Sequence, residues 1–187
     1  MLAAIIARVS GAEYTEYLRS ALFEPAGMRS TCFTGDAPPS GATVAIGSSA
    51  RGPSRSALEH PYGSFGYQYR GMGGVVSTAW DLWRRDRALR GDAVLAAESR
   101  EALFAPGPGS YGLGWFVAGS GVPGDPRIQG HGGGVRGFTC DPRRYPDFDG
   151  ALIVLCDSDS WPIGLIVAAL ERALLAEGDA ADLDLAA

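Results

Sequence analysis

The stretch GHGGGVRGFTCDPRRYPDFDGALIVLCD, residues 130–157, decides the fold class of this chain. Its last part, ALIVLCD, is an uninterrupted apolar run typical of a central strand that is buried on both faces. The preceding VRGFTC alternates only weakly, and the segment DPRRYPDFDG is expected to be the loop of a long antiparallel hairpin between the two. An antiparallel sheet is therefore predicted in this half of the chain.

Two more strands and one helix are expected around this hairpin. The segments YGLGWFVAG (111–119) and RIQGH (127–131) have strand composition. The segment WPIGLIVAALERALLA (161–176) is apolar around most of a helical circumference, so this helix should pack on the sheet. The acidic tail from Glu177 onward is expected to be frayed.

The first half of the chain has helical patterns. Residues 2–9 predict a helix that ends at Ser10, with Gly11 as its left-handed cap. A second helix is expected to end before Pro25, which disfavours helical geometry at the residue before it. Its apolar stripe consists of Tyr14, Tyr17, Leu18, Ala21 and Leu22. The segment from Thr34 to Pro61 is rich in Pro, Gly and Ser and predicts a long surface loop.

A further helix is predicted to begin at Thr78 and to end near Gly91, because Thr78 and Asp81 have the spacing of a capping box. Its buried side should consist of Trp80, Leu82 or Trp83, and Leu89. Its charged residues are expected to form a solvated face: Arg84, Arg85, Arg87 and Arg90, with Asp81, Asp86 and Asp92 among them. A shorter helix is expected from about Ala93 to Phe104.

This order of elements predicts an α+β fold in a single domain over residues 1–187. Residues 1–105 form the mainly helical region with the loop 34–61, residues 108–176 hold the strands and the C-terminal helix, and residues 177–187 form the tail.

The composition excludes several classes of function. The chain has 187 residues, a net charge of −5 and no basic stripe, which argues against a nucleic-acid partner. The apolar opening MLAAIIARV meets Arg8 well before the ~20 residues that a membrane span needs. It also lacks the basic start and cleavage site of a signal peptide. The compartment stays open between cytoplasm and periplasm.

The three cysteines, Cys32, Cys140 and Cys156, have no CxxC spacing and no histidine at ligand distance. A zinc site is therefore not expected, and no other metal or cofactor is predicted. An odd number of widely spaced cysteines favours reduced thiols. Cys140 and Cys156 could lie on neighbouring strands, but the sequence does not fix their register.

His131 stands at the head of a run of three glycines, Gly132–Gly134. Because glycine weakens a strand, either an unusual backbone geometry or the close approach of a ligand should account for the run. A plain surface turn is the alternative. HGGG is also the oxyanion-hole motif of lipase-type α/β-hydrolases, but that fold needs a later GxSxG and a later histidine, and the sequence has neither.

Six segments provide a wider comparison: LAAIIARVSG, EYLRSALFEPAGM, GGVVSTAWDL, YGLGWFV, GHGGGVRGF and ALIVLCDSD. In this order they resemble the serine β-lactamase and penicillin-binding-protein superfamily, most of all its class C-like branch of esterases and D-amino-acid peptidases. The resemblance covers residues 1–176. It implies an incomplete fold of this type, without the N-terminal helix, the first strands and the nucleophile helix.

The resemblance implies roles for the glycine run. His131 would match the histidine of the Lys/His-x-Gly motif, donating a hydrogen bond or positive charge to the substrate, and the N–H of Gly134 would serve the oxyanion hole. Gly132 and Gly133 would let the substrate lie against the backbone. The implied substrates are esters, β-lactams or D-amino-acid peptides. Gly132 stands where β-lactamases usually carry a hydroxyl residue, which disfavours β-lactams.

The family's Ser-x-x-Lys and Tyr-x-Asn motifs have no counterpart, because the sequence contains no lysine and no asparagine. Ser48–Arg51 and Tyr62–Ser64 imitate them, but an arginine cannot act as a base and Tyr62 lies beyond the family's position. Both motifs are expected upstream of Met1 in a longer protein. The chain alone is therefore expected to be inactive. The alternative is a non-catalytic binding module that pairs with another chain through an open sheet edge.

The other candidate residues carry less weight. His60 precedes a proline and is expected to be a surface histidine without a partner. Tyr111 and Trp115 would line the cleft by resemblance, although aromatic residues on strands usually belong to the core. Asp157 and Asp159 follow the last strand, where polar residues are common.

Overall fold

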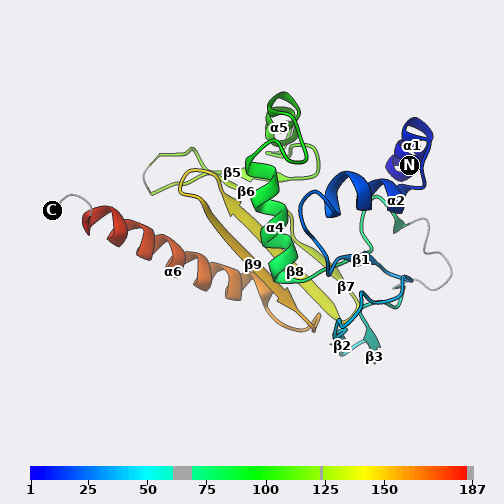
Figure 1. The fold of residues 1–187 in the computed structure, drawn as a ribbon. Helices are drawn as coiled ribbons and strands as arrows, with labels where there is room; N and C mark the ends of the chain where they lie inside the picture. The colour runs from blue at the N-terminus through cyan, green and yellow to red at the C-terminus, as the bar shows by residue number, and fades with distance from the viewer. Residues whose placement is uncertain (61–68, 123, 185–187) are drawn as a thin grey trace.

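The computed structural model describes residues 1–60, 69–122 and 124–184, and confirms an α+β fold (Figure 1). The helices are α1 (Leu2–Ser10), α2 (Tyr14–Leu18), the π-helical turn η1 (Arg19–Phe23), α4 (Ala79–Arg90), α5 (Ala97–Phe104) and α6 (Ile163–Asp184). The strands are β1 (Cys32–Phe33), β2 (Ile46–Ser49), β3 (Gly52–Ser56), β4 (Val75–Val76), β5 (Phe116–Ala118), β6 (Ile128–Gly130), β7 (Gly133–Val135), β8 (Phe138–Tyr145) and β9 (Gly150–Cys156).

The main sheet is antiparallel and is built around β8. On one side, β8 pairs with β6 and then with β7, which follow each other along the same edge. On the other side, β8 pairs with β9 over its whole length. β5 pairs with the outer edge of β6. Strand β8 of the predicted antiparallel hairpin is thus the centre of the sheet.

The boundaries of this hairpin differ from the prediction. β8 continues through DPRRY to Tyr145, so only the last residues of the predicted loop form the turn. Arg144 and Tyr145 are both buried, Arg144 against Asp86 of α4 and Tyr145 against Glu171 of α6. Because these polar groups point inward to partners, the strand does not show the usual alternation of polar and apolar residues.

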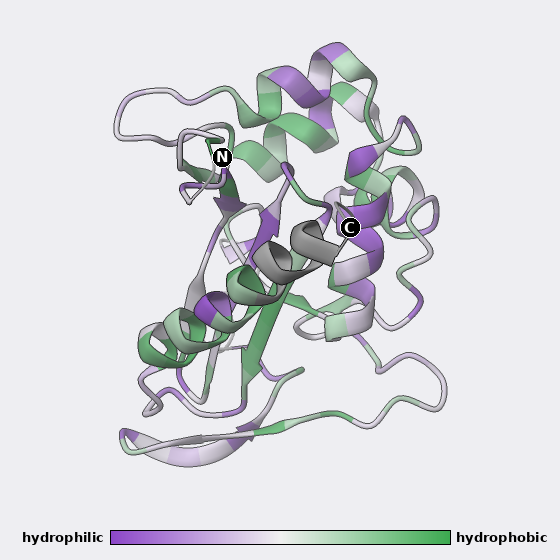
Figure 2. Ribbon diagram, turned by 90° about the vertical axis from the view of Figure 1, so that its left-hand side faces the viewer, coloured by the Kyte–Doolittle hydropathy of each residue, from purple (hydrophilic) through white to green (hydrophobic). Residues whose placement is uncertain are grey.

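β9 is also not a central strand, since within the described ranges it pairs only with β8. Its two faces contact α4 and α6, which explains why the strand is apolar throughout. α6 packs on β8 and β9 as predicted and buries Val167 completely. The described turns of α6 are mostly hydrophobic (Figure 2). The helix continues to Asp184 and so includes most of the tail predicted from Glu177 onward.

The N-terminal helices follow the sequence prediction. α1 ends at Ser10, and Gly11 adopts the left-handed conformation with φ of 72°. The second helix ends before Pro25, after the π-helical turn η1. Apolar side chains from these elements and β1 form one buried cluster: Ala3, Tyr14, Phe23, Met28 and Phe33.

Helix α4 begins after Thr78 as predicted, and the Thr78 hydroxyl accepts a hydrogen bond from the Asp81 N–H at 3.2 Å. Its buried side includes the predicted Leu89 and also Ala88, but its other two buried residues are Asp81 and Asp86. Trp80 and Trp83 are exposed, whereas Asp81 is 0% and Asp86 6% exposed. The prediction of a solvated charged face is therefore wrong for both carboxylates.

Each carboxylate has partners that make its burial possible. Asp81 accepts hydrogen bonds from the Ser30 N–H at 2.7 Å and the Thr31 hydroxyl at 2.8 Å. It therefore ties the start of α4 to the segment that leads into β1. Asp86 binds arginines of α4 and β8.

The predicted surface loop 34–61 contains the hairpin β2–β3, which packs on the main sheet. The Ser48 N–H donates to the carbonyl of Asp157 at 2.8 Å, and Gly47 lies directly against Gly137 and Phe138. Two other boundaries move inward: α5 begins at Ala97, and only Phe116–Ala118 of YGLGWFVAG is a strand.

Candidate functional site

The glycine run lies on the edge of the sheet, at a break between two strands. β6 ends at Gly130 and β7 begins at Gly133, so His131 and Gly132 form the break. β5 reaches no further than Gly130, and among the described strands none pairs with the outer edge of β7. His131 and the three glycines are exposed.

Pro142 explains why the strand breaks at His131. The two residues lie opposite each other, and the His131 N–H donates to the Pro142 carbonyl at a long 3.4 Å. Proline has no N–H to return, so the second hydrogen bond of this pair cannot form. His131 therefore makes only one backbone hydrogen bond with Pro142, and its carbonyl receives none from that residue.

The ladder also fixes where the N–H of Gly134 points. Val135 and Phe138 close a two-residue turn in which Gly137 has φ of 88°, and such a closing pair exchanges both backbone hydrogen bonds. Hydrogen-bonded and non-hydrogen-bonded pairs alternate, so Gly134, opposite Thr139, is a non-hydrogen-bonded pair. The N–H of Gly134 thus points away from β8, toward the open edge.

The fold itself does not require glycine at three positions of the run. Gly132, Gly133 and Gly134 all lack a positive φ. A Cβ atom added to them would meet nothing closer than 3.4 Å, an ordinary contact distance. Gly130 differs, because its Cβ would lie 2.8 Å from the Pro142 carbonyl oxygen. An unusual backbone geometry therefore does not account for the run.

Alanine substitutions test this conclusion. Gly132→Ala and Gly133→Ala are each expected to leave the free energy of unfolding unchanged or to raise it by about 0.4–1 kcal/mol, since alanine restricts the unfolded chain. Gly130→Ala, the matched control, should destabilise the fold. Urea unfolding followed by circular dichroism measures both. A loss of stability in Gly132→Ala equal to that in Gly130→Ala would mean that the run serves the fold.

Two aromatic rings hold the imidazole of His131. The ring centroid of His131 lies 5.7 Å from that of Tyr111 and 5.2 Å from that of Phe116. Its Nδ1 lies 2.6 Å from the Gly132 carbonyl oxygen. Because a carbonyl can only accept, Nδ1 carries the proton, and in the neutral ring Nε2 is the unprotonated nitrogen.

The cleft residues expected by resemblance separate in the structure. Tyr111 lies beside His131, whereas Trp115 packs against Phe104 at 5.1 Å and under the guanidinium of Arg85. Phe116 was not predicted from the sequence. It follows Trp115 directly in the chain, and its ring lies beside that of His131, although its cross-strand partner is Gly130.

Cys140 lies on β8 opposite Gly133, and all three cysteines are free. Burial raises the pKa of the Cys140 thiol, while a hydrogen bond from the Gly133 backbone acts in the opposite direction. A raised pKa lowers the thiolate fraction, so Cys140 has the character of a structural thiol rather than a nucleophile.

The segment that imitates the Ser-x-x-Lys motif lies in another part of the structure. Ser48–Arg51 belongs to the β2–β3 hairpin, where the Ser48 hydroxyl donates to the Asp157 carbonyl at 3.2 Å. Asp159 accepts hydrogen bonds from the Ser49 hydroxyl at 2.7 Å and from the Gly137 N–H, so its role is structural. Tyr62–Ser64 lies outside the described residues. His60 is half-buried and packs edge-on against Tyr69 at 5.8 Å, so the prediction of a partnerless surface residue is wrong.

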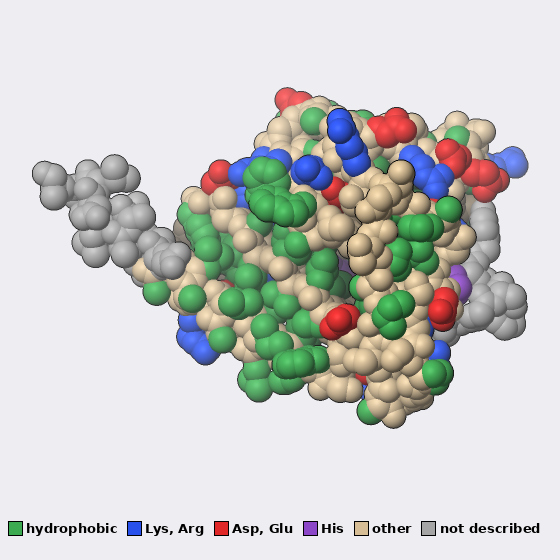
Figure 3. All heavy atoms as spheres, turned by 60° about the horizontal axis from the view of Figure 1, so that its bottom comes forward, with side chains coloured by type: hydrophobic (Ala, Val, Ile, Leu, Met, Phe, Trp, Pro, Cys, Tyr) green, Lys and Arg blue, Asp and Glu red, His purple; other side chains and the backbone are tan. Residues whose placement is uncertain are grey.

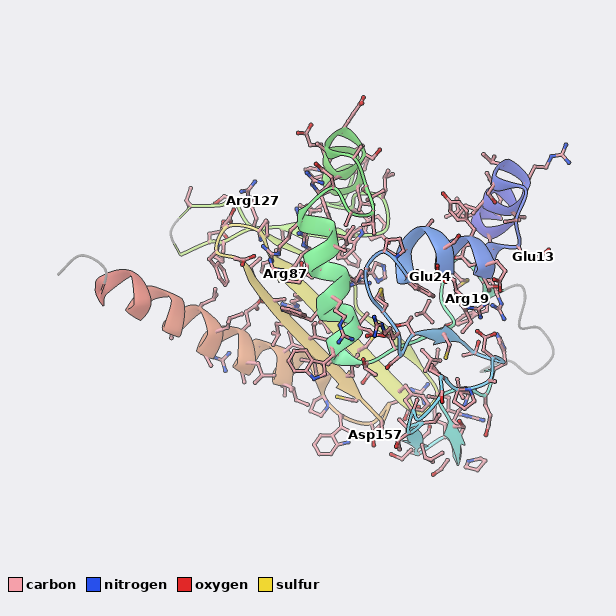
Figure 4. The ribbon with its side chains drawn as sticks, in the orientation of Figure 1. Glu13, Arg19, Glu24, Arg87, Arg127 and Asp157 are labelled. Atoms are coloured by element: carbon pink, nitrogen blue, oxygen red, sulfur yellow. The ribbon has the colours of Figure 1, made fainter. Side chains whose placement is uncertain are left out.

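A cavity of about 850 Å³ lies at the other end of β8, near the β8–β9 turn, and His131 is not among its lining residues. Arginine side chains line it, and each is paired with an acidic residue: Arg87 with Asp149, Arg90 with Asp86, Arg100 with Asp92, Arg127 with Asp147 and Arg144 with Asp86. Arg87 and Arg127 approach this turn from α4 and from the segment before β6 (Figure 4). The cavity is therefore lined by a network of ion pairs.

The described ranges contain no cluster of histidine, cysteine and carboxylate side chains that fits a metal ion. Within the same ranges, no helix has the length and apolar character of a membrane span.

Comparison with known families identifies the chain. The family model described as Beta-lactamase matches residues 1–181. The chain belongs to the Beta-lactamase family. Two curated relatives from Bacillus subtilis (strain 168) are similar to it. Penicillin-binding protein 4* is 30% identical over 190 residues, covering 85% of this chain and 38% of that protein. The putative penicillin-binding protein PbpX is 36% identical over 121 residues, covering 63% of this chain and 29% of that protein.

Solved structures show the Beta-lactamase family fold. The octameric penicillin-binding protein homologue from Pyrococcus abyssi matches with a TM-score of 0.73 and 23% identity, over 94% of this chain and 40% of that one. The D-amino acid amidase from Ochrobactrum anthropi SV3 matches with a TM-score of 0.71 and 21% identity, over 95% of this chain and 56% of that one. This member of the Beta-lactamase family therefore spans less than two fifths of its curated relatives and about half of its structural neighbours.

Proposed function

We propose that this chain contributes the edge strand of a serine-hydrolase active site, whose nucleophile lies in a part of the protein outside the given sequence. The observation that carries this proposal is the run Gly132–Gly134, which the fold does not require and which lies on an open strand edge. A substrate can lie against this bare backbone and pair with it as an added strand.

In the proposed reaction, a serine from outside the given sequence attacks the carbonyl carbon of an ester or amide. The carbonyl oxygen becomes an oxyanion, and the Gly134 N–H donates a hydrogen bond to this oxygen. Such a donor lowers the barrier by about 3–4 kcal/mol. The leaving group departs with a proton, and an acyl-enzyme remains, which water hydrolyses.

His131 acts in this scheme through Nε2. Because Nδ1 donates its proton to the Gly132 carbonyl, a neutral His131 can only accept at Nε2. It donates to the substrate only as the imidazolium. This chain also has no lysine to activate a serine, so we expect no hydrolysis by the 187 residues alone.

Two features guide the choice of substrate. Gly132 offers no hydroxyl beside the proposed site, which disfavours a β-lactam carboxylate. Solved neighbours include a D-amino acid amidase and a D-stereospecific amidohydrolase. D-amino-acid amides, peptides or esters are therefore the proposed substrate class.

The test is the intact mass of the protein from its native cells after treatment with a fluorophosphonate probe. We expect a labelled species clearly heavier than 19.5 kDa, while the recombinant 187-residue chain stays unlabelled. A labelled recombinant chain would contradict the placement of the nucleophile. An unlabelled species of 19.5 kDa in the cells would contradict the enzymatic proposal and favour the second candidate.

The second candidate is a non-catalytic module that binds another chain. The outer edge of β9 is unpaired among the described strands, and such an edge can accept a further strand. Exposed apolar side chains lie close to it in sequence, on β9, on α6 and in the segment between them: Leu155, Trp161, Leu165 and Leu170. Hydrophobic side chains also gather over a broad area of the face in Figure 3.

A further inference from the structure

The side chains of Tyr111 and Phe116 form an aromatic wall beside the proposed site. Their ring centroids lie 4.8 Å apart in an edge-to-face arrangement, and both rings contact His131. Phe116 belongs to β5, and Tyr111 comes from the turn before it and forms a bridge with Phe116. The wall therefore stands on the sheet rather than on a free loop, and its position relative to His131 is fixed by strand pairing.

The wall is not part of the core. Phe116 is 54% and Tyr111 36% exposed, whereas Trp115 between them points to the opposite face and packs on Phe104. Single exposed apolar residues are common on proteins. Two aromatic rings in contact with each other and with a candidate catalytic residue are a continuous apolar surface at a binding site.

The register gives the distance from the wall to the reacting atoms. Both rings of the wall contact His131, and the Gly134 N–H lies three residues further along the edge than His131. Three residues of extended chain span about 10 Å. Consider a substrate that pairs with the open edge and has its attacked carbonyl at the Gly134 N–H. The substrate residue that lies beside the wall is then about three positions away from that carbonyl.

We propose that Tyr111 and Phe116 select substrates that carry an aromatic or large apolar group about three residues from the carbonyl that is attacked. This inference rests on the proposed function and specifies its substrate. The wall offers ring edges and faces for stacking, and such aromatic pairs contribute about 0.5–1.5 kcal/mol beyond the burial of area. The two residues determine specificity and take no part in the bond changes.

The experiment uses the 187-residue chain labelled with nitrogen-15 and two probes, the D-series peptides acetyl-Phe-Ala-Ala-Ala-amide and acetyl-Ala-Ala-Ala-Ala-amide. Amide shifts of Gly132–Gly134 report whether the strand edge is occupied, and the titration gives both Kd values. We expect the phenylalanine peptide to bind about 5–10-fold more tightly. In Phe116→Ser and Tyr111→Ser this preference should fall below about twofold, with the Kd of the alanine peptide unchanged.

Two variants separate recognition from a structural effect. Phe116→Leu keeps an apolar side chain on β5, and should retain an intermediate preference. Trp161→Ser removes an aromatic ring that is 60% exposed outside the wall, and should bind both peptides as the wild type does. If the two peptides have equal Kd values and the Gly132–Gly134 amides still shift, the proposed selection by Tyr111 and Phe116 is contradicted, but the proposed site is not. If neither peptide shifts these amides, both the proposed site and the proposed selection are contradicted.

Discussion

Asp86→Ala is expected to lower the free energy of unfolding by about 3–5 kcal/mol, the largest effect predicted for a single substitution in this chain. The Asp86 carboxylate accepts hydrogen bonds from the Nε atoms of Arg144 and Arg90, both at 2.8 Å. The side chain of Arg144 is 7% exposed and that of Arg90 16%. Removing Asp86 leaves two guanidinium groups near each other with little access to water.

The pKa of Arg144 has the same physical origin. Burial lowers this pKa, and the Asp86 charge and hydrogen bond oppose the shift. Without Asp86, only the penalty of burial and the repulsion from neighbouring arginines remain. Because an arginine stays charged at accessible pH, the cost appears as lost stability rather than as deprotonation.

Asp149→Ala is the matched control for Asp86→Ala. Asp149 pairs with Arg87 and Arg90, but its side chain is 67% exposed, and surface ion pairs contribute at most about 1 kcal/mol. Urea unfolding of both variants, followed by tryptophan fluorescence, gives the comparison. If Asp86→Ala loses no more stability than Asp149→Ala, the buried network contributes nothing beyond ordinary surface pairs.

Gly47→Ala is expected to lower the free energy of unfolding by about 3 kcal/mol, at the upper end of the range for overpacking. An added Cβ would overlap the Gly137 carbonyl oxygen and would lie 2.6 Å from the Phe138 ring. The first of these is a backbone atom that cannot rotate away. The β2–β3 hairpin would have to move off the sheet, with loss of the hydrogen bonds between Ser48 and Asp157.

Gly91→Ala provides the control, because Gly91 has φ of −116° and no atom lies within 4 Å of its added Cβ. This variant should change stability by less than about 1 kcal/mol. Thermal unfolding by circular dichroism distinguishes the two glycines. A Gly47→Ala protein as stable as Gly91→Ala would mean that the hairpin does not pack on Gly137 and Phe138 as described.

The sequence predicted those parts of the fold that local rules determine. The capped ends of α1 and α4 follow from Gly11 and Thr78, and the apolar runs of β9 and α6 predict a strand and a helix that pack together. The inward side of α4 could not be predicted, because Asp81 and Asp86 are buried by partners about 50 residues away in the chain. No local pattern contains that pairing.

The residues of the candidate site also divide into those that the sequence predicted and those that needed the structure. His131 and the glycines were found through resemblance and through the cost of glycine in a strand. Pro142 belongs to the segment predicted to be a loop, yet it lies in β8 opposite the break. Phe116 could not be found from the sequence, because its contact with His131 depends on the tertiary structure.

The shared partner of β6 and β7 also limits how the glycine run can change in length. Both strands are paired with the single strand β8, on either side of the break at His131 and Gly132. Backbone groups and side chains alternate with a period of two, so loss of one residue at the break would turn the Gly134 N–H inward or force β7 out of register. Length variants at this point should therefore be tolerated in steps of two residues, and single insertions or deletions should be selected against.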